Sequence, residues 1–366
     1  MANNNNHTQR YCVIMCGGIG SRFWPSSTQA KPKQFIDFMG TGRSLLQMTY
    51  DRIRPLVPAE NILVVTNADY IPQIREQLPE LAEKQILAEP ARRNTAPCIL
   101  WAAHHIKALA GPEASMIVTP SDHLILKPEV FRDAVEHGFD FVEHNDAILT
   151  LGIEPSRPET GYGYIQMDAE VEPALHKVKT FTEKPDRELA KVFLASGDFK
   201  WNAGVFLWRV DNFLKAMAEH SSDLASRFQK GEGKYATEKE KRFIQKEFPA
   251  CPAESIDYAL MEKASNVYVR RVDPAWSDLG TWGSLYEQLP KNRQGNVTSG
   301  CQVLAYDTKG TIFSEEKPDK VIVAHGLDGY VVADTADALL ICPLSEEQRI
   351  KQYVNDVKSH LGDKYL

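Results

Sequence analysis

Short apolar runs alternate with longer amphipathic segments through the first part of the chain. The runs are rich in Val, Ile and Leu and lie at 11–16, 62–66, 85–88 and 116–119. Between them, apolar residues recur at helical spacing near 44–54, 70–82 and 95–110. This βα alternation predicts a Rossmann-like α/β fold, with a largely parallel sheet, helices on both faces and a ligand at the carboxyl ends of the strands.

The pattern changes after an amphipathic helix that is expected at 129–143. Strands with longer connections are expected at 147–153, 162–167, 176–183 and 203–209. Helices at 211–219, 237–247 and 254–264, a strand at 266–271 and a helix at 279–289 complete this part. We expect the sheet as a whole to be mixed rather than purely parallel.

A polar segment with proline and glycine, 290–296, is the best candidate for a domain boundary. Beyond it, short alternating runs predict strands near 301–306, 311–313, 320–324, 329–333 and 338–342, and then a helix over about 345–360. We therefore expect a large domain over 1–290 and a small β-rich domain over 291–366 that ends in a helix.

Composition narrows the possible partners. The 366 residues carry a formal net charge of −7, so no overall basic field favours nucleic acid, and an anionic substrate would need local cations. Residues 1–10 are polar and lack the apolar core of a signal peptide, and no later run is long enough for a membrane span, so we expect a cytoplasmic protein. The six cysteines have no CxxC spacing, which argues against a zinc knuckle or a disulfide framework.

A glycine turn directly follows the first apolar run. Its backbone amides are candidate phosphate ligands at Gly17, Gly18, Gly20 and Ser21. Arg22, directly after the turn, and Lys33, further along, add positive charge, whereas the spacings of the P-loop and of the dinucleotide fingerprint are both absent. The pattern favours a triphosphate site, and the alternative is a solvated hairpin with solvated lysines.

The motif GGxGSRFWPxS, followed by KPKQF, resembles the signature of bacterial mannose-1-phosphate guanylyltransferases, the sugar nucleotidyltransferases that make GDP-mannose. Further matching blocks occur in family order at 87–97, 120–123, 181–185, 201–206 and 276–280. The resemblance implies a GT-A-like catalytic domain, GTP and mannose 1-phosphate as substrates, Mg²⁺ as cofactor, and a homodimer. It also implies that the C-terminal region is a partial left-handed β-helix, in a form of the enzyme without an appended isomerase domain.

The proposed chemistry joins two anions, so charge repulsion rather than deprotonation is the obstacle. A phosphate monoester, with a second pKa of about 6, is already ionised at neutral pH and needs no general base. We expect Arg22 and Lys33 to hold the triphosphate, and Asp122 and Asp278 to hold Mg²⁺. A turn-initiating role is the alternative for Asp122, and a helix cap formed by Ser277 or Asp278 is the alternative for the other carboxylate.

The sugar phosphate is expected to meet residues from the middle of the chain. By resemblance, Glu183 accepts hydrogen bonds from sugar hydroxyls and Lys184 binds the sugar phosphate. Because Pro185 favours extended backbone at Lys184, we expect these two side chains on opposite sides of the strand. Asn202 offers both a donor and acceptors to a sugar, and Gly163 lets the backbone approach it. The alternative for Glu183 and Lys184 is a charged strand end with Asp186 capping the next helix. The alternatives for Asn202 and Gly163 are a turn asparagine and a β-bulge.

A carboxylate suits the amino donor of guanine, and Glu89 is the candidate, with Asn94 and Thr95 at the start of the following helix. Thr95 has an N-cap as its alternative role. The block 255–258 also resembles the family, but an amphipathic helix with a serine cap explains it equally well, so we leave it outside the predicted catalytic set.

Several functions remain open from the sequence. The family usually has a small residue where Ile19 stands and Ser where Ala203 stands. These departures weaken the prediction of which nucleotide is preferred more than the prediction of nucleotidyl transfer. Rival substrates are a heptose, fucose or glucose phosphate, or another base. A non-catalytic sensor of nucleotide sugars is a different class, as is a dehydrogenase, which the missing third glycine and Pro25 disfavour.

Overall fold

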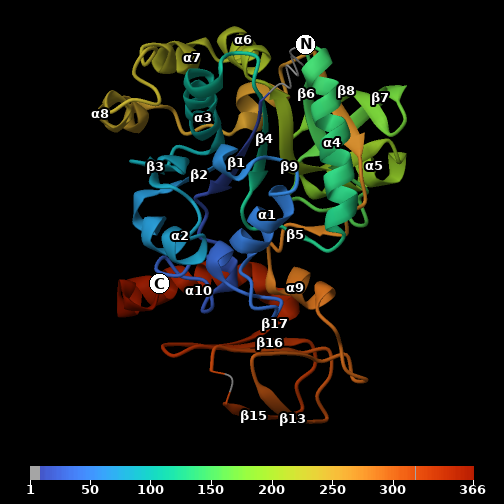
Figure 1. Cartoon of the computed structure of the whole chain (residues 1–366). Coiled ribbons are helices and arrows are strands. Elements are labelled where there is room, and N and C mark those ends of the chain that lie inside the picture. The colour runs from blue at the N-terminus through green and yellow to red at the C-terminus, as the bar shows by residue number, and fades with distance from the viewer. Residues whose placement is uncertain (1–8, 318) are drawn as a thin grey trace. The chain divides into compact units, whose positions relative to one another are not determined.

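The computed structural model describes residues 9–317 and 319–366. Contacts divide the chain into two compact units, which Figure 1 shows within one ribbon. The described part of unit 1 comprises residues 9–17, 50–120 and 125–276, and that of unit 2 comprises 18–49, 121–124 and the described residues from 277 to 366. The chain therefore passes between the units several times, within helix α1 (Leu45–Ile53) and strands β5 (Leu124–Ile125) and β11 (Trp276–Ser277) among other places.

Unit 1 is built on a mixed sheet, in which nine strands are found among the described residues. These strands are β1 (Arg10–Cys16), β2 (Ile62–Asn67), β3 (Ile86–Glu89), β4 (Ser115–Pro120), β6 (Ile148–Ile153), β7 (Tyr164–Glu172), β8 (Leu175–Thr182), β9 (Phe199–Arg209) and β10 (Val267–Arg271). Their order is β3-β2-β1-β4-β9-β6-β10-β8-β7. The β1–β4 and β1–β2 pairs are parallel, whereas β9 runs antiparallel to β4 and β6, so the predicted mixed sheet is confirmed.

Helices cover both faces of this sheet. The helices that lie wholly in unit 1 are α2 (Ile71–Gln77), α3 (Thr95–Ala110), α4 (Pro128–His144), α5 (Arg187–Ser196), α6 (Val210–His220), α7 (Ser222–Gln229) and α8 (Lys239–Glu247). Val13 and Trp208 share one core cluster with α3 and α6. On the other face, α4 lies so close that a Cβ on Gly138 would stand 2.8 Å from Leu149 Cδ2. The alternating strand pattern therefore sorts side chains between two helical layers.

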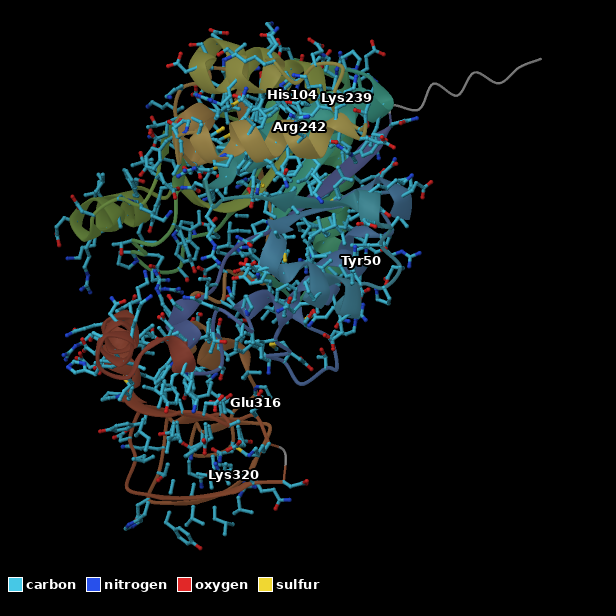
Figure 2. All side chains as sticks on the ribbon, turned by 90° about the vertical axis from the view of Figure 1, so that its left-hand side faces the viewer. Tyr50, His104, Lys239, Arg242, Glu316 and Lys320 are labelled. Carbon is cyan, nitrogen blue, oxygen red and sulfur yellow. The ribbon has the colours of Figure 1, made fainter. Side chains whose placement is uncertain are left out.

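A buried polar network joins α3 to α8. Glu240 accepts a hydrogen bond from Trp101 Nε1 at 2.7 Å, and both its carboxylate oxygens lie 2.9 Å from His105 Nδ1. The pKa of Glu240 is lowered, because the hydrogen bonds and the nearby His105 outweigh the opposing effect of burial. Figure 2 labels the neighbouring His104 of α3 and Lys239 of α8.

The secondary structure departs from the predictions in several places within unit 1. Helices α5 and α7 were not predicted as separate elements, although Asp186 caps α5 by accepting from Leu189 N, as the alternative for that segment implied. The helix expected at 254–264 is a five-residue π-helical turn, Asp257–Met261. Strand β9 begins at Phe199, before the predicted 203, so Asn202 lies inside a strand and not in a turn.

Unit 2 combines the glycine loop region with the C-terminal elements. Its remaining elements are α9 (Trp282–Gln288), β12 (Val297–Ser299), β13 (Gln302–Tyr306), β14 (Ile312–Glu315), β15 (Val321–His325), β16 (Tyr330–Asp334), β17 (Leu339–Pro343), a 3₁₀ segment (Leu344–Arg349) and α10 (Ile350–Leu361). Strands β12, β14 and β16 pair in parallel, as do β13 and β15. Lys320, labelled in Figure 2, forms ion pairs with Asp334 and Glu315.

The core of unit 2 explains why its segments belong together. Phe23, Phe38, Trp282 and Ile350 share one cluster of buried side chains, with the Phe23 ring 4.7 Å from the Phe38 ring and 5.2 Å from the Trp282 ring. The boundary expected at 290/291 therefore lies inside unit 2. The C-terminal strands followed by a helix are confirmed, while the left-handed β-helix and the functional division at 290/291 stay predictions.

Candidate active site

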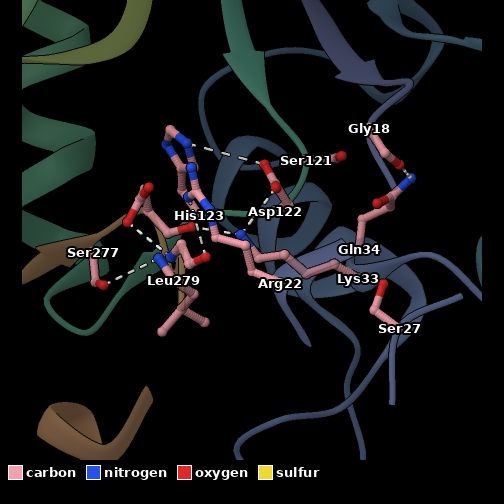
Figure 3. A network of polar contacts seen from close by, with 12 residues as sticks. Gly18, Arg22, Ser27, Lys33, Gln34, Ser121, Asp122, His123, Ser277 and Leu279 are labelled. Atoms are coloured by element: carbon pink, nitrogen blue, oxygen red, sulfur yellow. Dashed lines mark hydrogen bonds and ion pairs between the residues drawn. The ribbon is translucent and has the colours of Figure 1, made fainter. Parts of the chain in front are cut away.

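A cavity of about 290 Å³ lies within unit 2. Residues from distant segments of the sequence line it: Gly20, Ser21, Arg22, Lys33, Asp122, His123, Asp278, Leu279, Gly280 and Lys351. Figure 3 shows many of these side chains converging. The structure thus brings four residues of the predicted catalytic set to one place: Arg22, Lys33, Asp122 and Asp278.

The glycine loop is folded against the segment that carries Lys33. Lys33 N donates to Ile19 O at 3.1 Å, and Gln34 Nε2 donates to Gly18 O at 3.0 Å. Gly20 has a φ of 74°, and a Cβ there would stand 2.5 Å from Lys33 Cβ. Glycine is therefore required at position 20 by both conformation and space. The alternative of a solvated hairpin is wrong, because the loop is fixed by these contacts.

Lys33 is buried, with 4% of its surface exposed, and its ammonium group bridges two predicted site residues. Nζ lies 3.0 Å from Asp122 Oδ2 and donates to the backbone carbonyl of Asp278 at 2.5 Å. Burial alone would raise the pKa of Asp122, but the charges of Lys33 and His123 lower it below its usual range. Asp122 is therefore ionised at neutral pH, and Lys33 is not the solvated loop cation of the alternative interpretation.

Asp278 does not cap the helix that follows it. Thr281 caps α9 by accepting from Ser284 N, while Ser277 Oγ accepts from Leu279 N. Asp278 Oδ1 accepts from Gly280 N at 2.9 Å, within a turn in which Leu279 has a φ of 43°. The helix-cap alternative is thus wrong for both candidate residues, and the turn presents the Asp278 carboxylate at the cavity.

Arg22 retains an unsatisfied donor. Its Nη1 donates to Gly280 O at a long 3.4 Å, and its buried Nε has no hydrogen-bond partner among the described residues. An unpaired buried N–H costs free energy, and a guanidinium at such a position is suited to an anionic acceptor.

The donor set of this cavity fits a hard divalent cation. Within the part of the chain that the structure describes, no cluster of three or more His, Cys, Asp and Glu side chains could hold a metal ion. Mg²⁺ requires fewer, since one or two carboxylates together with phosphate oxygens and water complete its shell. The carboxylates of Asp122 and Asp278 meet that requirement.

A second cluster lies in unit 1, where β7, β8 and β9 begin or end. Asn202 N donates to Gly163 O at 2.8 Å. A Cβ on Gly163 would stand 2.5 Å from Glu183 Oε2 and 3.3 Å from Asn202 Cβ. The structure therefore brings together Gly163, Glu183 and Asn202, and only glycine leaves room for Glu183.

The predicted orientation of Lys184 is wrong. Its φ is 48°, which is left-handed and not extended, and its N donates to Tyr162 O at 3.2 Å. Its ammonium group forms an ion pair with the Glu183 carboxylate, so the two side chains are neighbours rather than on opposite sides. Strand β8 ends at Thr182, so the alternation expected of a strand no longer applies at these residues.

Asp257 is a residue that the sequence interpretation left out of the site. Its Oδ1 accepts from Asn202 Nδ2 at 3.0 Å. Burial raises its pKa to about 7, and the nearby Glu183 adds to the rise while Lys184 opposes it. The signal in the sequence was the block 255–258, which an amphipathic helix seemed to explain. The π-helical turn that carries Asp257 is a rare conformation that is often found at functional sites.

The candidate base-binding residues lie around the end of β3. Burial raises the pKa of Glu89 to about 7, although the charge of Arg92 opposes this. A Cβ on Gly17 would stand 3.5 Å from Glu89 Oε2, so the first glycine of the loop borders this carboxylate. Asn94, with a φ of 65°, is the N-cap of α3, which corrects the N-cap alternative for Thr95. Thr95 Oγ1 instead accepts from Ile256 N at 2.8 Å.

A comparison with models of known protein families identifies the class to which this protein belongs. The model of the nucleotidyl transferase family matches residues 11–295. The chain therefore belongs to the nucleotidyl transferase family.

Curated relatives narrow the class further. A Klebsiella pneumoniae protein named mannose-1-phosphate guanylyltransferase is 37% identical over 362 residues, which cover 96% of this chain and 75% of that protein. An Escherichia coli protein of the same name is also 37% identical, with the same coverage. A crystal structure described as mannose-1-phosphate geranyltransferase from Thermus thermophilus has a TM-score of 0.86 at 27% identity, and covers 96% of this chain and 100% of that chain. These matches confirm the resemblance to the mannose-1-phosphate guanylyltransferases.

No helix that the structure describes, over 9–317 and 319–366, is long and apolar enough to cross a membrane.

Proposed function

We propose that this enzyme transfers GMP from GTP to mannose 1-phosphate and releases pyrophosphate. The observation that carries the proposal is the gathering of Arg22, Lys33, Asp122 and Asp278 around one cavity. Two cations and two carboxylates can there serve a triphosphate and a divalent cation together. The names of the curated relatives support mannose 1-phosphate and guanine as the reactants.

In this mechanism an oxygen of the sugar phosphate attacks the α-phosphorus of GTP. The bond from that phosphorus to the bridging oxygen breaks, and its electron pair leaves with pyrophosphate. Mg²⁺, held by Asp122 and Asp278, would neutralise phosphate charge when bound. Arg22 offers its unsatisfied Nε–H to a phosphate oxygen, and Lys33 keeps Asp122 ionised and in position.

Further residues are assigned to the individual reactants in this proposal. Glu89 accepts hydrogen bonds from guanine, beside Asn94 and Thr95 at the start of α3. Glu183 and Asn202 meet sugar hydroxyls near Gly163, and Lys184 binds the sugar phosphate. The loop amides from Gly17 to Ser21 bind phosphate oxygens.

A pyrophosphate-release assay over a matrix of triphosphates and sugar 1-phosphates, with and without Mg²⁺, tests the proposal. We expect turnover with GTP and mannose 1-phosphate that depends on the metal. Turnover with another sugar phosphate or another base would replace the proposed substrates. Tight binding of GDP-mannose without turnover of any pair would indicate a sensor.

The same proposal includes a homodimer, as the family resemblance implies, and a cytoplasmic location. Light scattering of the purified chain across a concentration series measures the first property, and cell fractionation measures the second. A monomer at every concentration would contradict the proposed dimer.

A further inference from the structure

The first turn of the C-terminal helix α10 reaches the catalytic cavity. Ile350 is fully buried in the same core cluster as Phe23 and Trp24, the two residues that follow Arg22 in the glycine loop region. This anchor fixes the start of the helix beside that loop. Lys351, the next residue, lines the cavity together with Arg22 and Lys33.

The three cations of this cavity differ in their partners. Lys33 is paired with Asp122 at 3.0 Å. Among the residues of 9–317 and 319–366, no carboxylate forms an ion pair with either Arg22 or Lys351. Glu347, one helical turn before Lys351, accepts from Gly283 N at 2.6 Å. Arg22 and Lys351 therefore bring positive charge to the cavity without an ion pair among these residues, and Glu347 is a carboxylate whose charge interacts with that of Arg22.

The charges of Arg22 and Lys351 also interact with each other. The charge of Arg22 lowers the pKa of Lys351, with a further contribution from burial. Two like charges that face one cavity cost free energy until an anion joins them, and a polyanion gains from both. The acidic residues of the lining are Asp122 and Asp278. Both are already proposed to bind the metal, and Asp122 also pairs with Lys33.

We propose that Lys351 binds the β- and γ-phosphates of the nucleoside triphosphate and the pyrophosphate that leaves. This inference rests on the proposed function, since it assigns a further residue to the same reaction. As the bond between the α-phosphorus and the bridging oxygen breaks, negative charge moves onto pyrophosphate, and an ammonium group on a flexible stem can follow it. The C-terminal region thus supplies a residue of the active site itself.

The decisive variants are Lys351→Met, which removes the charge but keeps most of the length, and Lys351→Arg, which restores it. Lys358→Met is the matched control, because Lys358 lies on the same helix, is exposed and pairs with Asp363 at 3.0 Å. Each variant is assayed in the forward direction with GTP and in the reverse direction with GDP-mannose and pyrophosphate. Thermal melting of each variant checks that it is folded.

For Lys351→Met we expect KM for pyrophosphate and for GTP to rise about tenfold or more, as expected for a lost charge-assisted contact. KM for mannose 1-phosphate should stay within about twofold, Lys351→Arg should recover most of the loss, and Lys358→Met should behave as wild type. An unchanged KM for pyrophosphate in Lys351→Met overturns the inference, as does an equal loss in Lys358→Met.

Failure of the proposed function gives a different result. If the wild-type enzyme shows no turnover with GTP and mannose 1-phosphate, calorimetric titration with inorganic pyrophosphate and Mg²⁺ still tests the role of Lys351. Binding to wild type that weakens about tenfold in Lys351→Met supports the inference. Equal binding by both proteins, or binding by neither, overturns it.

Discussion

At the residue scale, the buried charge of Lys33 connects two segments of the site. A lysine that is only 4% exposed requires partners for its ammonium group, and Lys33 contacts a carboxylate oxygen of Asp122 and the backbone carbonyl of Asp278. The two aspartates thus relate to Lys33 differently, because it pairs with the carboxylate of Asp122 but with the backbone carbonyl of Asp278. Substituting each aspartate in turn can therefore distinguish its contribution to stability from the metal-binding role that the two residues share.

We predict that Asp122→Asn and Asp278→Asn each lower turnover by about a hundredfold or more, since each removes a carboxylate from the metal site. Asp122→Asn should also lower the free energy of unfolding by roughly 1–3 kcal/mol, because Lys33 loses its counter-charge. Asp278→Asn should leave stability nearly unchanged, since the backbone carbonyl remains. Steady-state rates at saturating Mg²⁺ and urea unfolding measure both effects.

The exposed Asp273, which pairs with Lys127 at 3.1 Å, is a matched control for these two variants, and Asp273→Asn should alter neither property. Near-normal rates in both Asp122→Asn and Asp278→Asn would remove the metal assignment.

Asp257 carries a second residue-scale prediction. Its carboxylate is held by Asn202 and lies close enough to Glu183 for the two charges to interact. Asp257→Asn keeps the shape but removes an acceptor for sugar hydroxyls, so KM for mannose 1-phosphate should rise about tenfold while KM for GTP is unchanged. Stability at pH 8 should not fall, because the variant no longer buries a charge there.

Asp223→Asn, an exposed change on α7, is the control for this variant, and both constants should remain at wild-type values in it. An unchanged sugar KM together with reduced stability in Asp257→Asn would show that the residue has only a structural role. The sequence could not single out Asp257, because its environment depends on Asn202 and Glu183, which are distant along the chain.

At the scale of elements, the glycine loop and the segment after it act as one piece. The sequence predicted a phosphate loop from its glycines, and it placed Lys33 beside the loop through the family motif. It could not predict which glycine fixes Lys33, because that depends on a tertiary contact between Gly20 and the lysine stem. Similarly, the strand period placed Glu183 and Lys184 on opposite sides, but β8 ends before them.

Gly20→Ala tests this coupling, with Gly40→Ala as its matched control. Both glycines have positive φ, of 74° and 66°, but a Cβ would collide with Lys33 at position 20 and meets nothing within 4 Å at position 40. Each variant should lose about 1 kcal/mol of stability or more through backbone strain. Only Gly20→Ala should lower kcat/KM for GTP, by about tenfold or more, because it displaces Lys33. Equal kinetic effects in both variants would contradict the coupling.

At the scale of the whole molecule, the sequence predicted the mixed α/β sheet and the C-terminal strands followed by a helix. Period and composition identify such elements because they reflect local burial. The two compact units could not be predicted in the same way, since each is assembled from discontinuous segments. The polar segment 290–296 looked like a linker, yet Trp282 before it and Ile312 after it share a core.

Global stability should therefore depend on pH through carboxylates that the fold buries, and Glu89 is the clearest case. Burial raises its pKa from 4.5 to about 7, so between these values the folded chain keeps a proton that the unfolded chain has released. Raising the pH through this window lowers the free energy of unfolding, by on the order of 3 kcal/mol for this group. Asp257 adds a change of the same sign, because its pKa is also raised to about 7.

Glu89→Gln should make this decline with pH less steep and raise the free energy of unfolding at pH 8. Urea unfolding over pH 5 to 8.5 measures this, and Glu83→Gln, an exposed change, should leave the pH dependence unaltered.

Glu89→Gln should also weaken GTP binding, because a neutral amide is a poorer acceptor for guanine than a carboxylate. In the wild type, GTP binding should weaken as the pH falls below about 7 and Glu89 takes up its proton. A Glu89→Gln variant that is no more stable at pH 8 would show that the buried carboxylate does not limit stability, whereas unchanged GTP binding would remove Glu89 from the base site.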